Sequence, residues 1–436
     1  MKTTVEDMRR VLEILAPVVP SKSTLPITAN VLLQEGKAIS TDLTVAAQMV
    51  FPAAKEPLLI PHRLVSAALH HIAGSTPLEV STETGPRGSE VVFHMGKATL
   101  RYPMGRPDEY PPIPQVDGEV DSWEVAGDAL LHAMREVLPY CATDDSRPVL
   151  ACVCLTLGEP AVAVGADGFR LAIKQLPFNM PSEGGTNLLV PTGAVRVLAH
   201  VWDLVDKIRP PTDGSIATRL MAKPTIRVTD GQHHLKFHLG DAVVTVSHTT
   251  GTYPGYRTLV PTHPSWTVRV NSQELYAAVQ GLAPLANAGS GIVRLAWAAG
   301  GPLMLTAMAE DSGSMEVALH ATVTGEAGQI AFNVQYLLDY LKGLDALVTL
   351  EGTSPYAPAI WRHHIAPLLV LMPMSVGGVT PPPQGSTEGS APEDIQATED
   401  EGPPPEQPEG QDGPGEEKTT PVPARPSRAR RTRVKS

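Results

Sequence analysis

The sequence predicts an α+β fold in which one unit, made of two helices and several short strands, occurs three times. The main observation is a repeated motif: residues 25–33 (LPITANVLL) align without a gap with residues 147–155 (RPVLACVCL). Farther along, Thr41-Asp42-Leu43 falls opposite Ala166-Asp167-Gly168, and residues 292–308 hold a fainter third copy. Self-similarity of this kind predicts an architecture of repeated structural units.

The helices are predicted from apolar residues at helical spacing and from start signals. Asn271, followed by Glu274, is a favourable helix cap with a supporting acidic residue, and Pro61 and Pro191 suit the first position of a helix. Asn333 stands where these two prolines stand. The predicted helices are residues 4–19, 61–71, 127–140, 192–208, 271–282 and 328–345.

The strands are predicted from short apolar runs between turn signals. Glu35-Gly36 and Gly158-Glu159-Pro160 mark two hairpin turns, and the second of them joins two apolar strands within residues 146–173. The other predicted strands are residues 24–33, 38–51, 58–60, 78–81, 90–94, 98–102, 187–190, 225–228, 234–239, 242–248, 292–295, 304–308, 347–350, 359–362 and 368–372.

Composition indicates a protein of a reducing compartment, and we expect it in the cytoplasm. Apolar residues make up 42% of the chain, which is enough for ordinary cores. Its three cysteines are too few for a disulfide framework. No apolar run reaches the roughly 18 residues of a membrane-spanning helix, and the acidic N-terminus is unlike a signal peptide. We therefore expect no contact with membranes.

Breaks in the pattern divide the chain into domains and a tail. After residue 376 the composition changes to Pro, Gly, Glu and Ser with almost no large apolar residues, so this segment is expected to be disordered. Its end, from Arg425, is basic. The predicted boundaries are 1–120, 121–262 and 263–376 for three domains and 377–436 for the tail.

The repeated units also bear on assembly and on charge. Each domain holds two half-units whose strands need neighbours, because open sheet edges are a liability. A chain of such units favours closure, either within the chain or by a second copy joined head to tail. The net charge of −12 is a sum over all surfaces. It does not exclude a basic concave surface for nucleic acid, since only the local field matters there.

The sequence favours no enzyme, metal site or cofactor. His70-His71 and His363-His364 are the histidine pairs, and adjacent residues in a helix or strand point apart, so neither pair is expected to chelate a metal. The chain has no phosphate-binding glycine loop followed by Lys and Ser or Thr. We therefore assign no catalytic residues.

Five motifs occur in order along the chain. They are residues 21–27 (SKSTLPI), 144–150 (DDSRPVL), 167–172 (DGFRLA), 253–257 (YPGYR) and 372–374 (MPM). In this combination the chain resembles the bacterial sliding clamp, the beta subunit of the replicative DNA polymerase. The resemblance covers residues 1–376, and the tail has no counterpart in the usual family pattern.

This resemblance implies a fold and a function. The family fold has three clamp-type domains in each chain and forms a head-to-tail homodimer, a ring whose helices line a hole around double-stranded DNA. Binding to DNA would be independent of sequence. The family has no catalytic activity and needs no cofactor. DNA polymerase and clamp-loader subunits would bind through short peptides, in a pocket between the second and third domains.

The resemblance assigns basic residues to DNA. Phosphate contacts need only positive charge and reach, which suits sliding. Taken singly, each of these side chains could be an ordinary solvated residue, but most lie on the repeated helices, which repetition would bring to one surface. The helix predicted at 271–282 has no Lys or Arg. The assigned residues are Lys22, Arg147, Arg10, Arg63, Arg135, Arg196, Lys207 and Lys342.

The resemblance also implies the residues of a peptide-binding pocket. They are Leu150, Gly168, Phe169, Arg170, Leu171, Pro254, Leu259, Asn333, Tyr336, Met372, Pro373 and Met374. Methionine suits a pocket that accepts several partners, because its side chain is flexible and polarizable. The chain departs from the family at Phe169, commonly His, at Thr258, often Arg, and at Ser375-Val376, where the family ends Arg-Leu.

A second interpretation stays open. The acidic balance and the uneven basic lining are also compatible with a clamp-like protein that binds the replication machinery without encircling DNA. Retention on circular DNA distinguishes the two interpretations.

Overall fold

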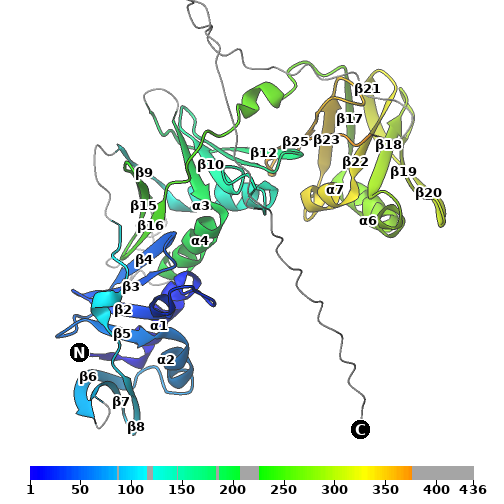
Figure 1. Ribbon diagram of the computed structural model, residues 1–436. Helices are drawn as coiled ribbons and strands as arrows, with labels where there is room; N and C mark the ends of the chain where they lie inside the picture. The colour runs from blue at the N-terminus through cyan, green and yellow to red at the C-terminus, as the bar shows by residue number, and fades with distance from the viewer. Residues whose placement is uncertain (86–87, 115–120, 145, 183–185, 207–224, 376–436) are drawn as a thin grey trace, which may run out of the picture. The chain divides into compact units, whose positions relative to one another are not determined.

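The computed structural model of the chain describes residues 1–85, 88–114, 121–144, 146–182, 186–206 and 225–375 (Figure 1). All of these residues belong to one compact unit. The tail predicted at 377–436 lies outside the described residues, as does Lys207 near the end of the helix predicted at 192–208. None of the described helices is long and apolar enough to span a membrane.

Helices alternate with groups of strands along the chain. Up to residue 114 the elements are β1 (Lys2–Thr4), α1 (Val5–Leu15), β2 (Asn30–Gln34), β3 (Lys37–Thr41), β4 (Val45–Val50), β5 (Leu58–Pro61), α2 (His62–Leu69), β6 (Pro77–Gly85), β7 (Gly88–Met95) and β8 (Ala98–Pro103). From residue 121 to 247 they are β9 (Asp121–Ala126), α3 (Gly127–Val137), β10 (Cys152–Thr156), β11 (Val162–Ala166), β12 (Arg170–Gln175), β13 (Asn187–Pro191), α4 (Thr192–Asp206), β14 (Thr225–Asp230), β15 (His234–Leu239) and β16 (Ala242–Ser247).

The C-terminal part follows the same alternation. Its elements are β17 (Trp266–Asn271), α6 (Ser272–Ala288), β18 (Ile292–Trp297), β19 (Leu303–Ala309), β20 (Gly313–Leu319), β21 (Ala321–Gly325), β22 (Gly328–Asn333), α7 (Val334–Leu341), β23 (Leu347–Gly352), β24 (Ala359–Arg362) and β25 (Leu368–Leu371). Short 3₁₀ turns lie at Ala16–Val18, Pro26–Ala29, Pro107–Glu109, Leu138–Tyr140 and Tyr256–Leu259.

The described strands form four antiparallel sheets. The two smaller sheets have the orders β1-β6-β7-β8 and β20-β19-β18-β22. The two larger sheets have the orders β5-β2-β3-β4-β16-β15-β14-β9 and β13-β10-β11-β12-β25-β24-β23-β17-β21. Each larger sheet therefore joins strands from distant parts of the chain. We call the β4–β16 pairing the first junction and the β12–β25 pairing the second junction.

Most predicted helices are confirmed with small changes at their ends. Thr4 caps α1 by accepting a hydrogen bond from the Asp7 amide at 3.1 Å, and Asn271 caps α6 as predicted. The helix predicted at 328–345 is wrong in its first six residues, because Gly328–Asn333 is strand β22 and Asn333 caps α7, which ends at Leu341. Pro61 closes strand β5, so α2 begins one residue later than predicted and ends at Leu69.

Three predicted strands are wrong in part. Pro26 has no amide hydrogen for a strand ladder, and residues 26–29 form a 3₁₀ turn, so the strand begins at Asn30. The run 38–51 is two strands, because Asp42 turns the chain between β3 and β4. In the stretch 146–173 the first strand begins only at Cys152, and Arg147 accepts turn hydrogen bonds from the Leu150 and Ala151 amides.

Besides β22, the prediction missed six strands: β1, β9, β12, β17, β20 and β21. The strands β9 and β17 each precede the first helix of their part of the chain and alternate buried and exposed side chains. Trp123 and Val125 are buried in β9, and Trp266 and Val268 are buried in β17. Their alternation is a period-two signal that sequence analysis could have used.

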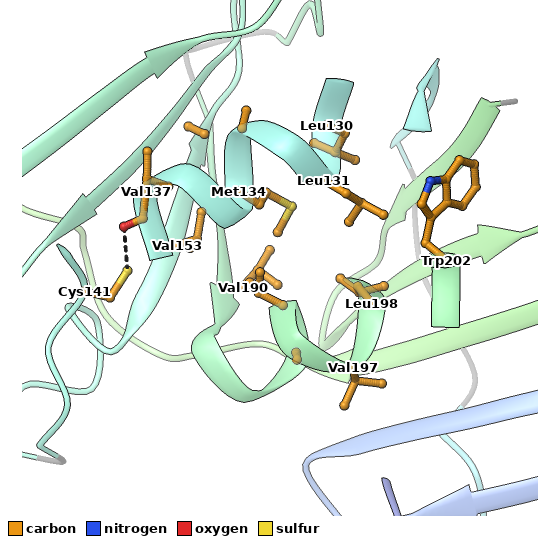
Figure 2. Close-up of a cluster of buried hydrophobic side chains, with 14 of the residues drawn as sticks. Leu130, Leu131, Met134, Val137, Cys141, Val153, Val190, Val197, Leu198 and Trp202 are labelled. Atoms are coloured by element: carbon orange, nitrogen blue, oxygen red, sulfur yellow. Dashed lines mark hydrogen bonds between the residues drawn. The ribbon is translucent and has the colours of Figure 1, made fainter. Parts of the chain in front are cut away.

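The core beneath β10 and β13 lies between two helices (Figure 2). Leu131 and Met134 of α3 point toward Val190 and Leu198, and all four side chains are at most 1% exposed. Burial of each such side chain stabilises the fold by roughly 1.5–3 kcal/mol. The apolar stripes that predicted the helices are therefore the faces that fix α3 and α4 under their sheet.

Candidate functional site

The corner between β11 and β12 organises the site, and it has a structural copy. Asp167 Oδ1 accepts hydrogen bonds from the amides of Phe169 and Arg170 at 2.9 and 3.0 Å. Asp42 Oδ1 accepts from the amides two and three residues after it in the same way, at 2.9 and 2.7 Å. Both corners turn through a left-handed residue, Leu43 with φ 79° and Gly168 with φ 96°. The alignment of Asp42 with Asp167 is therefore confirmed.

Strand pairing extends the match from the corners to the junctions. Ala46 pairs with Thr41 and Leu171 pairs with Ala166, so Ala46 and Leu171 hold the same place after their corners. Across the first junction Ala46 lies opposite Thr245. Across the second junction Leu171 lies opposite Val370. The two junctions therefore have the same register but different side chains.

The side chains at the matched positions of this sheet face are larger and more apolar at the second junction. Val370 lies beside Ile360, whereas the matching Thr245 lies beside Lys236. Ile360 and Val370 belong to a buried cluster with Leu150, Leu171, Tyr253 and others. At the first junction the corresponding buried cluster is smaller and comprises Leu32, Ile39, Leu59 and Tyr110. At these matched positions the second junction has large apolar side chains, whereas the first has Ala46, Thr245 and Lys236.

The second junction opens into a cavity of about 390 Å³. Eight residues predicted for the peptide pocket line it: Leu150, Gly168, Phe169, Arg170, Leu171, Pro254, Leu259 and Met372. Phe169 and Leu259 are more than half exposed, at 56% and 53%, so two large apolar side chains stand at the rim without a covering partner in the chain. An apolar cavity with such a rim is typical of a site that buries apolar side chains of a ligand.

Four predicted pocket residues are not among those that line the cavity. Asn333 accepts hydrogen bonds from the Gln335 and Tyr336 amides and caps α7. The ring of Tyr336 packs against the Arg170 guanidinium. Met374 bonds through its backbone amide to the Ala331 carbonyl at 2.8 Å, and Pro373 lies between Met374 and the lining residue Met372.

Other lining residues were not predicted for the pocket. They are Arg147, Ala166, Tyr253, Tyr256, Pro358 and Val370. The tyrosines flank the Pro254-Gly255 motif, so their spacing carried a signal. The Tyr256 hydroxyl lies 3.1 Å from the Thr156 hydroxyl, and burial raises the pKa of Tyr253. Pro358 gave no signal in the sequence.

Arg147 lies at this cavity, although sequence analysis assigns it to DNA. Its Nη2 donates to the Asp167 carbonyl at 3.0 Å. A Cβ at Gly168 would lie 2.4 Å from Arg147 Nη1, so this guanidinium would have to shift if residue 168 carried a side chain. The φ of 96° at Gly168 is the stronger reason for glycine, because side chains rarely adopt this backbone conformation.

The thiols of Cys152 and Cys154 are part of the buried cluster around the cavity. Burial raises the pKa of Cys154 and of nearby Cys141 to about 12. All three cysteines are free and buried. Because these groups stay protonated near neutral pH, they are poor nucleophiles.

The basic residues assigned to DNA differ in their surroundings. Lys22, Arg63, Arg196 and Lys342 are exposed and make no ion pair with any residue that the structure describes. Arg135 instead donates to Asp203 at 2.6 Å and to the Ala199 carbonyl at 2.9 Å. Arg10 is half-buried, and Lys207 lies outside the described residues. The exposed four are the cations most available to phosphates.

The histidine pairs do not point apart, so that expectation is wrong. The ring centroids are 4.8 Å apart for His70 and His71 and 4.3 Å apart for His363 and His364. His364 follows the end of β24, where strand alternation no longer applies. Ligand atoms of Asp345, His363 and His364 come within 4.8 Å of one another, but His363 Nε2 donates to the Asp345 carbonyl. We therefore assign no metal to this cluster.

Comparisons with known proteins show which proteins this chain is similar to. Residues 257–366 match the family model of the DNA polymerase III beta subunit, C-terminal domain. The Beta sliding clamp of Synechocystis is 26% identical over 375 residues, covering 80% of this chain and 92% of the relative. The Beta sliding clamp of Escherichia coli is 25% identical, covering 79% of this chain and 90% of the relative.

Solved structures match as well. A DNA polymerase sliding clamp from Pseudomonas aeruginosa with ligand has a TM-score of 0.74 at 23% identity, covering 86% of this chain and 99% of its own. The beta subunit from Thermotoga maritima has a TM-score of 0.73 at 20% identity, covering 86% and 99%. The matches confirm the resemblance that the motifs indicated: this chain is a relative of the bacterial DNA polymerase III beta subunit, the beta sliding clamp.

Proposed function

We propose that this chain is a DNA sliding clamp. In this function it forms a non-catalytic ring around duplex DNA and tethers a DNA polymerase, the clamp loader and other replication or repair proteins. The observation that carries the proposal is the apolar cavity at the second junction, with exposed Phe169 and Leu259 at its rim. Its relatives named Beta sliding clamp support the same function.

The cavity suits a short peptide with a Gln head and a Leu/Phe tail. Its lining is mainly apolar, so affinity would come from burying the two tail side chains, as a few anchors usually carry such interfaces. Burying two such side chains contributes roughly 3–6 kcal/mol before ordering costs, which corresponds to micromolar binding at best. Weak binding at each of two cavities would allow exchange of partners while favouring a tethered polymerase.

We infer the ring from the free sheet edges. Each junction pairs the last strands of two three-stranded sets. The first junction pairs β4 of β2-β3-β4 with β16 of β14-β15-β16, and the second pairs β12 of β10-β11-β12 with β25 of β23-β24-β25. By position, β20 corresponds to β4 and β12, and β8 corresponds to β16 and β25. Within the described residues, β8 and β20 are end strands of the two four-stranded sheets. Pairing β8 of one copy with β20 of the next would repeat the junction twice and close a head-to-tail homodimer of six half-units.

The register of this contact follows from the two junctions. Ala98 begins β8 as Ala242 begins β16, each after a Gly-containing two-residue turn. Transferring the β4–β16 register, we infer that Leu100 faces Met315 and that Ala98 faces Val317. Leu100, Ala98 and Val317 all pack at the main core. This register therefore places the apolar side chains of both strands on the same, inner face of the sheet. A slip by one residue would place the apolar side chains of one strand beside the outward-facing side chains of the other.

Cross-linking tests the ring and its register. Leu100→Cys with Met315→Cys in one chain should give a covalently closed dimer, because directly opposed residues come within disulfide reach. The native cysteines are buried and should not interfere. Arg101→Cys with Met315→Cys, a register shift of one residue, is the matched control and should cross-link poorly. A clean monomer by light scattering at micromolar concentration would contradict the ring.

Retention on DNA tests the encircling function. The chain, loaded on a nicked circular plasmid, should stay bound in moderate salt and leave when the plasmid is linearised. Reversing charge at Lys22, Arg63 and Arg196 together should impair retention, since phosphate contacts carry sequence-independent binding. Lys236→Glu, on the sheet, is the control and should leave retention intact. A chain that stays bound after linearisation would bind DNA without encircling it.

A further inference from the structure

Arg170 is among the residues that line the cavity, but its guanidinium makes its hydrogen bonds on the other side of strand β12. Neighbouring residues in a strand point to opposite faces. Leu171 belongs to the buried cluster around the cavity. The Arg170 guanidinium instead meets the 3₁₀ turn that follows α3 and the helix α7. Its contacts are therefore with the helical side of the second junction.

Three hydrogen bonds hold this guanidinium. Nε donates to Asp167 Oδ2 at 2.8 Å, and Nη1 donates to Asp339 Oδ2 at 2.8 Å. Nη2 donates to the Pro139 carbonyl at 3.0 Å. The Arg170 side chain is only 11% exposed. Asp167 and Pro139 precede β12 in the chain, whereas Asp339 lies on α7. The three hydrogen bonds therefore connect the two sides of the junction, and we call this set of bonds the strut.

Two aromatic rings pack on the same group. The guanidinium carbon lies 4.5 Å from the Tyr336 ring centroid and 5.2 Å from the Tyr140 ring centroid. Tyr140 comes from the turn after α3 and Tyr336 comes from α7. Burial lowers the Arg170 pKa, but the hydrogen bonds to Asp339 and Asp167 outweigh that effect and raise it. The charge is therefore retained inside the junction.

The first junction has no such group. Val45 holds the place of Arg170, because both begin the strand after the matched corner. Val197 holds the place of Asp339. Pro191 and Asn333 are the last residues of matching strands, and Val197 lies six residues after Pro191 as Asp339 lies six residues after Asn333. Both valines are buried. An apolar pair thus replaces the ion pair at the first junction.

The strut is connected to the cavity through β25. The Met372 amide donates to the Phe169 carbonyl at 2.9 Å, one residue before Arg170. Met372, Val370 and Pro358 line the cavity from the C-terminal side. Phe169 lines it from the corner and Leu171 from β12. A shift of α7 and β25 relative to the corner would therefore change the width of the cavity.

We propose that the guanidinium of Arg170, a residue that also lines the cavity, is a positioning group that sets the width of the peptide cavity through the strut. It ties Asp339 of α7 to the corner at Asp167 and so fixes the lining residues of β25 against those of β12. This role rests on the proposed peptide-binding function. It differs from the polar pocket role that the family resemblance assigns to Arg170.

A double-mutant cycle separates the two roles. The probe is a fluorescein-labelled peptide with a Gln head and a Leu-Phe tail, titrated against the full chain. Asp339 does not line the cavity. Asp339→Ala should nevertheless weaken binding about threefold to tenfold and Arg170→Ala at least tenfold. The double variant should be no weaker than Arg170→Ala, because both changes break one strut.

Hydrogen exchange of the Met372 amide is the second measurement. It should be faster in Arg170→Ala and in Asp339→Ala than in the unchanged chain. Unchanged peptide affinity in Asp339→Ala, with weakened binding in Arg170→Ala, would overturn the proposal in favour of direct contact. If the unchanged chain binds no peptide, the proposed peptide-binding function fails. The positioning role of Arg170 is tested separately, because an unchanged exchange rate of the Met372 amide in both variants would overturn it.

Discussion

The two junctions share a backbone and differ in chemistry. Both pair their strands in the same register after the same Asp-anchored corner. At the second junction Leu171, Val370 and Ile360 make the sheet face apolar, and a cavity opens there. At the first junction the matching residues are Ala46, Thr245 and Lys236. Strand pairing alone therefore builds the junction, and a few side chains decide whether it also binds a ligand.

On the helical side of the sheet the difference in polarity is reversed: the first junction is apolar and the second is charged. The helical side of the first junction has valines at positions 45 and 197, whereas the second has Arg170 and Asp339. Replacing a buried ion pair by apolar residues often costs no stability. The charged pair at the second junction is therefore better explained by the fixed geometry that a cavity requires than by stability.

The largest expected effect is the loss of peptide binding in Leu171→Asp. Burying a carboxylate among Leu150 and Val370 is unfavourable, so affinity should fall by roughly 100-fold or more. The matched control is Leu43→Asp at the corner of the first junction, where the side chain is exposed. It should leave peptide affinity unchanged in a fluorescence titration. Retained affinity in Leu171→Asp would move the binding site elsewhere.

A smaller effect is expected for Gly168→Ala. The residue has φ 96°, and its new Cβ would meet the Arg147 guanidinium at 2.4 Å. We expect a loss of about 1–2 kcal/mol in folding stability and weaker peptide binding, since Arg147 lines the cavity. Leu43→Gly, with φ 79° and an exposed side chain, should change the melting temperature little or upward. Equal destabilisation by both variants would contradict this contrast.

Much of the fold was predictable because its signals are local. The helix stripes gave α1, α3 and α4, and the Asp42 and Asp167 corners were matched from sequence alone. The boundaries failed where one residue changed the backbone. Pro26 cannot join a ladder, and Asn333 caps a helix after a strand. These local effects override the apolar pattern. The pattern alone had predicted a strand through Pro26 and a helix through Asn333.

The site was predictable only in part, for a different reason. Residues from β12 and from Pro254 were assigned by resemblance, and the cavity includes them. Val370 on β25 and Pro358, directly before β24, are about 200 residues away from β12, and their position depends on sheet order, which no local pattern encodes. The partners of Arg170 were hidden in the same way, because Asp339 is distant in sequence.

The next prediction exchanges one residue between the junctions. Val370→Thr gives the second junction the residue that the first has at Thr245, and it adds a hydroxyl to the cavity. Loss of an apolar contact worth about 1 kcal/mol should weaken peptide binding roughly threefold to fivefold. Thr245→Val is the reciprocal control and should leave affinity unchanged. An unaltered titration for Val370→Thr would mean that β25 contributes only shape.

The smallest expected effect concerns the polar face of the first junction. His238 on β15 is half-buried, and burial, Lys236 and Arg227 together hold its pKa below the ordinary value of 6.5. The unfolded chain takes up this proton first as the pH falls, so the folded chain loses stability below about pH 6.5. Lys236→Ile, the residue of the second junction, removes a nearby positive charge and should raise the His238 pKa in an NMR titration. It should also reduce the fall in melting temperature between pH 7.5 and 5.0. His320→Gln, at an exposed position, is the control and should leave the fall in melting temperature unchanged. A His238 pKa that is the same in Lys236→Ile and in the unchanged chain would show that Lys236 does not affect His238.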